Sequence, residues 1–238
     1  MLVGDLEGYR HLDRVLRNAA WWADDFAIVC DNSDDDTFDA CLGRTDNVQR
    51  VGISMMAQDE SRARNTVMAM LDTVAKDGDI IVVLDADEEL LTNTKTFPRM
   101  VLPSVALDAA WKSDRHAWPC LFVHHWDPLG RTARMDGGWA PGYATRIYRH
   151  EQGRRIQQRE FACSPIPESA LIHVCPVEES PFVVRHWGYA YPHDRLRKQR
   201  YYQRRDGGRF HSARHLASIT EEPTLVNWME AVNGVDQQ

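Results

Sequence analysis

The chain has 238 residues, 43% of them hydrophobic, and a formal net charge of −7 at pH 7. This length suits one sizeable α/β domain with a core of its own. An odd number of cysteines without a C-x-x-C pair argues against a disulfide framework and a zinc knuckle. No stretch approaches the roughly 20 apolar residues that a membrane-spanning helix needs. We therefore expect a soluble, cytoplasmic protein.

The charge is distributed unevenly along the chain. Residues 1–100 hold 20 acidic and 10 basic residues, whereas residues 101–238 hold 15 acidic and 18 basic residues. An acidic half that can hold a cation would then face a basic half that could meet phosphate. The plain alternative is that two surfaces of the protein differ in charge.

The first part of the chain predicts alternating strands and helices. Residues 1–3 form a short apolar start, and apolar residues at helical spacing predict a helix over 9–22. A buried strand at 26–30 and a weaker strand at 48–53 follow. A helix that starts near residue 60 is ended by a glycine at residue 78.

The next strand, residues 79–84, is followed directly by acids. Five consecutive aliphatic residues predict a strand that is buried on both faces, and Asp85 and Asp87 stand where it ends. In open α/β sheets this end of the strands forms the ligand crevice, and paired carboxylates suit Mg²⁺ or Mn²⁺. The same spacing at 34/36 and 77/79 shows that the acids could equally form a solvated strand end.

The order of these elements predicts right-handed crossovers and a doubly wound parallel sheet. Beyond residue 91 the pattern changes. We expect a helix over 97–112, interrupted by Pro103, and strands of mixed or antiparallel pairing at 118–126, 143–148 and 170–174.

Two further segments of the second half have a distinct character. Residues 136–143, rich in glycine and aromatic residues, form either a loop that closes over a ligand or an ordinary hairpin connection. A last helix is expected over 194–205, and the tail beyond Gly207 is expected to be loosely packed.

Four motifs occur in a fixed order. Asp31 ends a strand and precedes N-S-D-D-D-T, the segment S-R-A-R-N spans 61–65, I-I-V-V-L-D-A-D-E-E-L spans 80–90, and R-H-W-G-Y spans 185–189. Together they resemble family 2 glycosyltransferases with the GT-A fold, the last motif being similar to the His-x-Gly-Tyr segment of one branch. The resemblance covers about residues 1–92 and 120–205.

This resemblance implies one α/β domain with a Rossmann-type, doubly wound, mostly parallel sheet. Residues 1–92 would form the nucleotide-sugar half, residues 93–205 a mixed-strand acceptor half, and residues 206–238 a C-terminal tail. It also implies transfer of a sugar from a nucleotide-diphosphate sugar, expected to be a UDP-sugar, with inversion. A divalent metal would neutralise the departing diphosphate.

Residue roles follow from the same resemblance. Asp85, Asp87 and His186 would hold the metal, with Asp85 also toward the nucleotide, and an imidazole ligand suits Mn²⁺ better than Mg²⁺. Arg64 and Asn65 would face the base or the diphosphate. As alternatives, Arg64 could be a surface cation and His186 a packed strand histidine.

The expected base-binding edge of the nucleotide site includes Asp31, which could instead only cap a helix. Val3 and Asp5 would belong to the same edge. The first strand is shorter than in the family, so this edge is abbreviated or the start codon was placed late.

The transfer also needs a general base that takes the acceptor proton. Glu168, Glu160 and Asp136 are the candidates, and Glu168 is preferred. The acceptor itself is unknown, whether protein, glycan, lipid-linked sugar or DNA.

A basic run spans residues 195–214. It is either a solvated helix face or a surface that binds a polyanion such as DNA through phosphate contacts. A non-catalytic nucleotide- or nucleic-acid-binding module is therefore the main alternative to an enzyme. A phosphatase of the haloacid-dehalogenase type, with Asp85 as nucleophile, is less favoured because Glu89 stands where that family has Thr and 84 residues precede Asp85.

Overall fold

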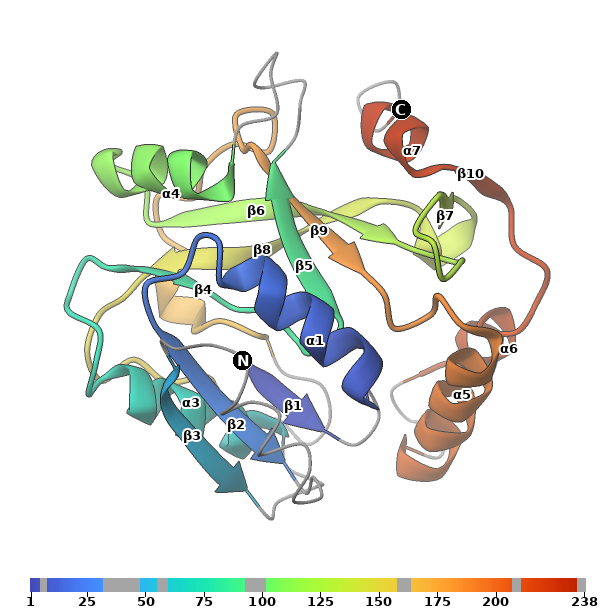
Figure 1. Ribbon diagram of the computed structural model, residues 1–238, viewed down its shortest axis with the longest axis horizontal. Coiled ribbons are helices and arrows are strands. Elements are labelled where there is room, and N and C mark those ends of the chain that lie inside the picture. Colours follow the sequence, from blue (N-terminus) through green and yellow to red (C-terminus); the bar gives the residue numbers. More distant parts are fainter. Residues whose placement is uncertain are drawn as a thin grey trace.

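A computed structural model of the protein describes residues 1–4, 8–31, 48–54, 60–92, 102–157, 164–206 and 211–234. The first half contains β1 (Leu2–Gly4), α1 (Gly8–Ala19), β2 (Phe26–Asp31), β3 (Val48–Ser54), α3 (Glu60–Leu71), β4 (Ile80–Val82) and β5 (Glu88–Thr92). The second half contains α4 (Pro103–Lys112), β6 (Ala117–His124), β7 (Thr132–Arg134), η1 (Gly137–Trp139), β8 (Gly142–Arg149), η2 (Glu168–Ala170), β9 (Phe182–His186), α5 (Pro192–Asp206), α6 (Ala213–Ser218), β10 (Leu225–Asn227) and α7 (Trp228–Gly234). The α/β class expected from the sequence is confirmed (Figure 1).

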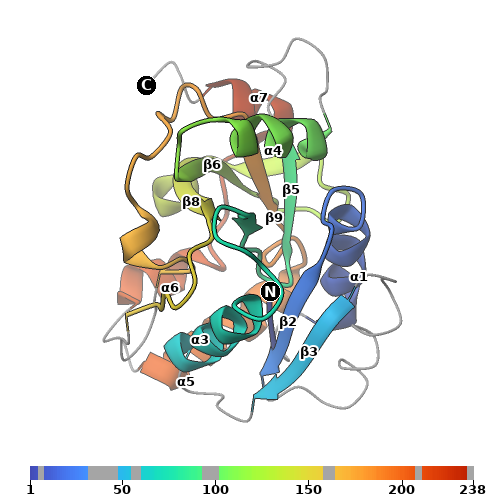
Figure 2. The same cartoon turned by 90° about the vertical axis from the view of Figure 1, so that its left-hand side faces the viewer.

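Strands β1, β2 and β3 form a three-stranded parallel sheet in this order. Strand β2 is central, and its apolar residues face both ways. Ile28 packs with Leu16 of α1, while Val29 packs with Val67 of α3. Figure 2 shows α3 beside this sheet. The predicted buried strand at 26–30 and the helices that flank it are therefore confirmed.

Strand β4 does not continue this parallel sheet, which corrects the single doubly wound sheet expected from the sequence. It pairs antiparallel with β8 in a five-stranded sheet of order β4-β8-β6-β9-β5, in which β6 and β9 are parallel. The two faces of the β4 segment are nevertheless both covered. Ile81 and Val83 pack with Met68 of α3, whereas Ile80 and Leu84 pack in the core beneath α4. A continuous apolar run in the sequence predicts burial on both faces of the strand, but it does not specify which strand is its neighbour in the sheet.

Helix α1 covers the edge strand β5 of the second sheet (Figure 1). The Asn18 side chain donates to the carbonyl oxygen of Leu90 at 3.1 Å, and the Leu90 amide donates to the Asn18 side chain, also at 3.1 Å. One side chain thus satisfies both backbone groups of a strand residue. This contact links α1, which packs against the parallel sheet, to the second sheet. It also protects the edge of that sheet at β5.

Helix α4 is closed at its C-terminus by Arg149, the last residue of β8. The Arg149 guanidinium donates from Nη2 to the carbonyl oxygens of Ala110 at 3.0 Å, Trp111 at 2.9 Å and Ser113 at 2.6 Å. The Ala110 carbonyl also accepts from the amide and the hydroxyl of Ser113, and a cation at this end of the helix complements the helix dipole.

Several predicted elements have different bounds. Helix α4 begins at Pro103, which occupies the first turn as proline commonly does, and residues 93–101 lie outside the described residues. The strand expected at 170–174 is absent. The 3₁₀ helix η2 ends at Ala170, and Val174 forms an isolated bridge with Ala117.

The C-terminal segment is packed, so the expectation of a loose tail is wrong. Strand β10 pairs antiparallel with β7, and Ile219 and Ala231 are fully buried. Its helices are only one or two turns long, which is too short for a clear periodic signal. The loop at 136–143 contains η1, whose Trp139 packs against this segment near Leu216. None of the helices in the described ranges has the length and apolarity to span a membrane.

Candidate functional site

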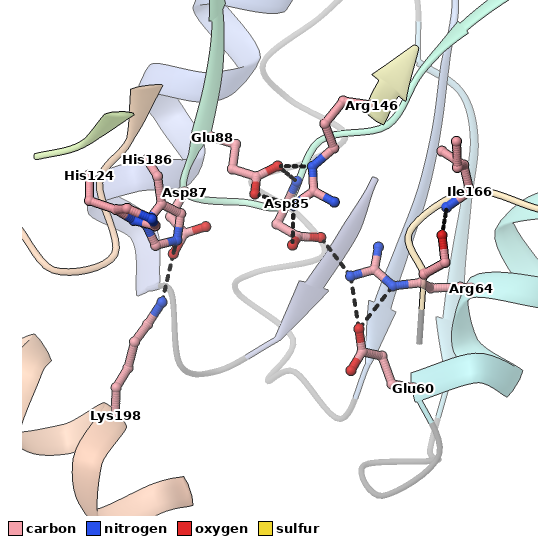
Figure 3. Close-up of polar contacts among 11 residues, drawn as sticks. Glu60, Arg64, Asp85, Asp87, Glu88, His124, Arg146, Ile166, His186 and Lys198 are labelled. Atoms are coloured by element: carbon pink, nitrogen blue, oxygen red, sulfur yellow. Dashed lines mark hydrogen bonds and ion pairs between the residues drawn. The ribbon is translucent and has the colours of Figure 1, made fainter. Parts of the chain in front are cut away.

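The acids after β4 lie in a charged cluster that joins both halves of the chain (Figure 3). Asp85 and Asp87 lie in the connection between β4, which ends at Val82, and β5, which begins at Glu88. Along this segment the carboxylates of Asp85 and Asp87 point toward different partners (Figure 3). Asp85 faces two arginines, and Asp87 faces a histidine and a lysine.

The Asp85 carboxylate is held by guanidinium groups. Arg64 Nη2 donates to Asp85 Oδ1 at 3.0 Å and also contacts Glu60, while Arg146 Nη2 lies 3.7 Å from Asp85 Oδ2. Arg146 forms its shorter contact, 2.6 Å, with Glu88 Oε1. Burial alone would raise the pKa of Asp85, but the two arginines outweigh it and hold the pKa below its usual range. Burial raises the pKa of Glu88, and Arg146 only partly offsets this effect.

The Asp87 carboxylate is 2% exposed and is surrounded by groups from the second half of the chain. Lys198 Nζ donates to Asp87 Oδ2 at 2.7 Å, and His186 Nε2 lies 3.3 Å from the same oxygen. On its other side His186 meets His124, with the two Nδ1 atoms 3.1 Å apart. Burial opposes ionisation of Asp87, yet Lys198 and His186 hold its pKa well below the usual range. Burial lowers the pKa of His124 well below the ordinary value.

Gly188 makes this arrangement sterically possible. A Cβ atom at this position would lie 2.2 Å from both Asp87 Oδ2 and Lys198 Nζ. Any side chain here would therefore push apart the carboxylate and the ammonium group.

The acids of the cluster are paired with cations. The carboxylates of Asp87 and Glu88 are buried, whereas the Asp85 side chain is 31% exposed. Arg64, Arg146 and Lys198 face these three acids, and Arg64 also contacts Glu60. Arg146 and Lys198 belong to the basic second half of the chain, so part of the uneven charge along the sequence is paired inside the molecule.

The predicted nucleotide-binding residues lie in different parts of the structure. Arg64 belongs to the cluster. Asn65 does not point into it, because its amide both donates to and accepts from the backbone of Ile156, at 2.9 and 2.7 Å. Val3 and Asp31 lie in the parallel sheet near the carboxyl ends of β1 and β2, where Val3 is opposite Cys30 and Asp31 is opposite Gly4. Asp5 lies outside the described residues.

The three candidate general bases are not brought together. Glu168 is exposed at the start of η2. Asp136 is bound by Arg134 through two contacts, at 2.9 and 2.5 Å, and accepts the amide of Thr224, which lowers its pKa. Its carboxylate thus links the end of β7 to the C-terminal segment. Glu160 lies outside the described residues.

Of the basic run, several members have structural contacts. Arg195 donates to the carbonyl oxygens of Trp126 and Tyr189, and Arg197 contacts Asp194 at 3.2 Å. Among the basic residues of this run whose side chains the structure describes, Arg200, Arg204 and Arg214 are exposed. A phosphate-binding surface on the described part of the run would use these three.

The site also contains residues that the sequence analysis missed: Glu88, His124, Arg146 and Lys198. A signal for Arg146 was present, since it is a lone cation within an otherwise apolar strand prediction. Lys198 is one of several basic residues at 195–214, and His124 lies within a predicted strand, so neither stood out in the sequence.

The metal expectation can be compared with the donor atoms present. Asp87 Oδ2 and His186 Nε2, 3.3 Å apart, are an oxygen and an imidazole nitrogen of the types that Mn²⁺ accepts. Asp85 is turned to the arginines. Among the described residues no group of three or more His, Cys, Asp and Glu side chains is placed to hold a metal ion. Asp87 and His186 thus supply two donors, and the Asp87 oxygen already accepts Lys198 Nζ at 2.7 Å. A metal ion here would have to displace this ammonium group and take its remaining ligands from substrate or water.

A cleft of about 480 Å³ lies between the two sheets. Its walls are apolar and polar in similar measure and include Phe26, Val67, Leu107 and Asp108. The cleft follows residues 79–84 along β4 and reaches Arg64, whose guanidinium binds Asp85, so it extends to the border of the charged cluster.

Comparison of the sequence with models of protein families finds no match, and comparison with curated proteins finds none either. Function is therefore argued from the geometry of the charged cluster.

Proposed function

We propose that the chain is a metal-dependent glycosyltransferase with a GT-A-type scaffold. It would transfer a sugar, with inversion, from a nucleotide-diphosphate sugar such as a UDP-sugar. The observation that supports this proposal most is the pair of carboxylates directly after β4, each held in place by cations from other elements.

The chemistry of the cluster suits a departing diphosphate. Negative charge develops on the leaving group as the glycosidic bond breaks, and fixed positive groups stabilise it. Arg64, Arg146 and Lys198 are such groups within the cluster. Asp87 and His186 would hold the divalent ion, which supplies further neutralisation of the leaving phosphate when bound.

The acids of the cluster already have cationic partners, and this affects metal binding. A divalent ion alone would add two positive charges to buried groups that already have partners. A nucleotide diphosphate brings the negative charge that offsets them. We therefore expect the metal and the donor to increase each other's affinity.

Glu168 remains the proposed general base, because it is the described candidate whose side chain is exposed to an incoming acceptor. Asp136 is committed to Arg134 and to the Thr224 amide. Exchange of Glu168 for Gln should lower the rate of transfer while leaving donor binding in place.

The test uses the full chain with a panel of nucleotide sugars, with and without Mn²⁺. Donor binding should raise the apparent melting temperature in the presence of Mn²⁺. Asp87→Asn should lower transfer or donor hydrolysis by about 10²–10³, whereas Asp114→Asn, at a side chain that is 96% exposed, should not. Activity that survives a chelator or Asp87→Asn would refute the metal mechanism. No thermal shift with any donor would refute the donor class.

A non-catalytic nucleic-acid-binding module is the second candidate, favoured by the exposed Arg200, Arg204 and Arg214. Salt-sensitive DNA binding that ignores nucleotide sugars, together with no turnover, would support it. A phosphatase with Asp85 as nucleophile is disfavoured because two guanidinium groups occupy that carboxylate.

A further inference from the structure

The cleft between the two sheets runs along an open edge of the second sheet. Strand β4 is the last strand of that sheet, with β8 on one side and no strand of the described residues on the other. Five consecutive residues, 80–84, line the cleft. Successive side chains of a strand point to opposite faces, so a cleft that meets all of them lies beside the strand and not over one of its faces.

The backbone of β4 has hydrogen-bonding groups on this open side. The Val83 amide donates to the carbonyl oxygen of Arg146, at the end of the pairing with β8, at 2.8 Å. Alternate residues of an antiparallel strand bond to the same neighbour, so the amides and carbonyls of Val82 and Leu84 face away from β8. An edge of this kind is a template for pairing with another extended segment.

Helices flank the space beside this edge on both faces of the sheet. Residues 104, 107, 108 and 111 line the cleft and recur at the spacing of one face of α4. From the other side α3 contributes Val67, Met68 and Leu71. A segment added beside β4 would lie between these two helices, so apolar side chains on both of its faces would be covered. It would also cover Trp111, which is 57% exposed.

The charge of the cleft is concentrated at one end. Its acids are Asp24 and Asp25, just before β2, Asp79, just before β4, and Asp108 of α4. Asp24, Asp25 and Asp108 are exposed and form no ion pair with the described residues. The base of the described lining is Arg64, which is already bound to acids next to the charged cluster. The cleft therefore offers unpaired negative charge at the end where β4 begins.

We propose that β4 binds an extended peptide with basic residues at one end as an additional strand of the second sheet. The peptide backbone pairs with the open edge of β4, and its apolar side chains contact α3 and α4. Its lysine or arginine side chains meet Asp24, Asp25 and Asp108. In this mode of recognition, main-chain hydrogen bonds give affinity and side chains give specificity. A simple amine or a lipid chain would leave the edge without a partner.

The test uses the ¹⁵N-labelled full chain and two synthetic peptides that cover both strand directions. They are acetyl-Lys-Lys-Val-Thr-Val-Thr-amide and acetyl-Thr-Val-Thr-Val-Lys-Lys-amide. One of them should bind with saturation and slow the hydrogen exchange of the Val82 and Leu84 amides. Replacement of its two lysines by glutamates should weaken binding by about 10-fold. No binding of either lysine peptide at about 1 mM would overturn the proposal.

Variants separate the edge from the acids. Val82→Pro removes an amide on the open side, which an edge strand tolerates, and should abolish peptide binding while circular dichroism stays native. Asp24→Asn combined with Asp25→Asn should weaken the lysine peptide by about 10-fold and should not weaken the glutamate peptide. Asp114→Asn, at an acid that is 96% exposed and outside the cleft, should change neither. If Val82→Pro does not fold, the acidic variants still decide.

Other occupants of the cleft give different results, and each of them would overturn the proposal. Lysine amide that binds as tightly as the peptide would indicate a site for a simple amine. A dimer of the chain that neither peptide dissociates would assign the edge to a second copy. Unchanged binding in a folded Val82→Pro would exclude strand pairing. Since none of these readouts uses a sugar donor, their outcome is independent of glycosyl transfer.

Discussion

Gly188 is the residue on which the packing around Asp87 depends most closely. Its backbone lies so close to the carboxylate and to the Lys198 ammonium group that no Cβ atom fits between them. A substitution here acts on the charged cluster without removing any of its charges.

Gly188→Ala should therefore destabilise the fold by about 1–3 kcal/mol, as overpacking does, and should weaken Mn²⁺ and donor binding. Equilibrium unfolding in urea and calorimetric titration measure the two effects. Gly138→Ala is the matched control, because a Cβ atom there meets nothing within 4 Å. If both variants behave alike, the close packing around Asp87 has no energetic role.

Two buried histidines should make stability depend on pH. Burial lowers the pKa of His11 to about 4 and that of His125 to about 3. Because these folded-state values lie below the unfolded value of about 6.5, the unfolded chain takes up protons first as the pH falls. Stability is therefore lost below about pH 6.5. From pH 7.5 to pH 5.0 each histidine should contribute a loss of about 2 kcal/mol.

Urea unfolding at these two pH values measures this loss. His11→Leu and His125→Gln should each reduce the difference between the two pH values. A Gln at 125 can still accept the bond that Arg185 donates to His125 at 2.8 Å. An unchanged pH dependence in both variants would contradict the assignment.

The sequence motifs predicted Asp85, Asp87 and His186 as one site, and the structure places Asp87 beside His186. The partners of these acids could not be predicted in the same way. Lys198 is 111 positions from Asp87 in the chain. Such a pair depends on where helix α5 lies relative to the connection between β4 and β5, and no local sequence pattern specifies that position.

At the level of elements, β5 is an edge strand of the second sheet. An edge strand has backbone groups without a neighbouring strand, and Asn18 supplies the partners for Leu90. Asn18→Ala should cost about 1–3 kcal/mol, because it leaves buried groups unsatisfied. It should also promote aggregation through the uncovered edge.

Chemical unfolding and light scattering measure both effects. Arg17→Ala, one residue away and with a side chain that is 72% exposed, is the control and should change stability by less than about 0.5 kcal/mol. Equal results for the two variants would show that α1 does not protect the edge.

Elements were predictable where apolar residues form a clear local pattern. The helix at 9–22 was located from apolar residues at helical spacing, and the strand at 26–30 from a continuous apolar run. The pairing of strands could not be predicted in this way, because β4 is covered on both faces beside β8 just as it would be beside β1. Short elements such as α6 lack enough turns to show a period.

For the whole molecule, the C-terminal segment should unfold together with the rest of the chain. Ile219 is fully buried in a cluster with Trp126 and Trp139 of the second half. Ile219→Ala should lower stability by about 2–5 kcal/mol, whereas Leu225→Ala, at a residue that is 42% exposed, should have a much smaller effect.

The measurement is urea unfolding followed by tryptophan fluorescence and by circular dichroism. Coincident transitions in Ile219→Ala would show that the segment is part of one cooperative unit. A small cost, or a separate early transition, would indicate that it folds on its own.

The contact between Arg149 and α4 has a consequence for the order of events during synthesis. The carbonyls at the end of α4 lie 36 to 39 positions before the guanidinium that binds them. At a translation rate of about 5–20 residues per second, this cap is made about 2–8 s after the helix that it closes. We therefore expect the end of α4 to reach its full stability only after β8 has been made. In pulse-labelled hydrogen exchange during refolding, amides there should become protected together with those of β8 and not before them.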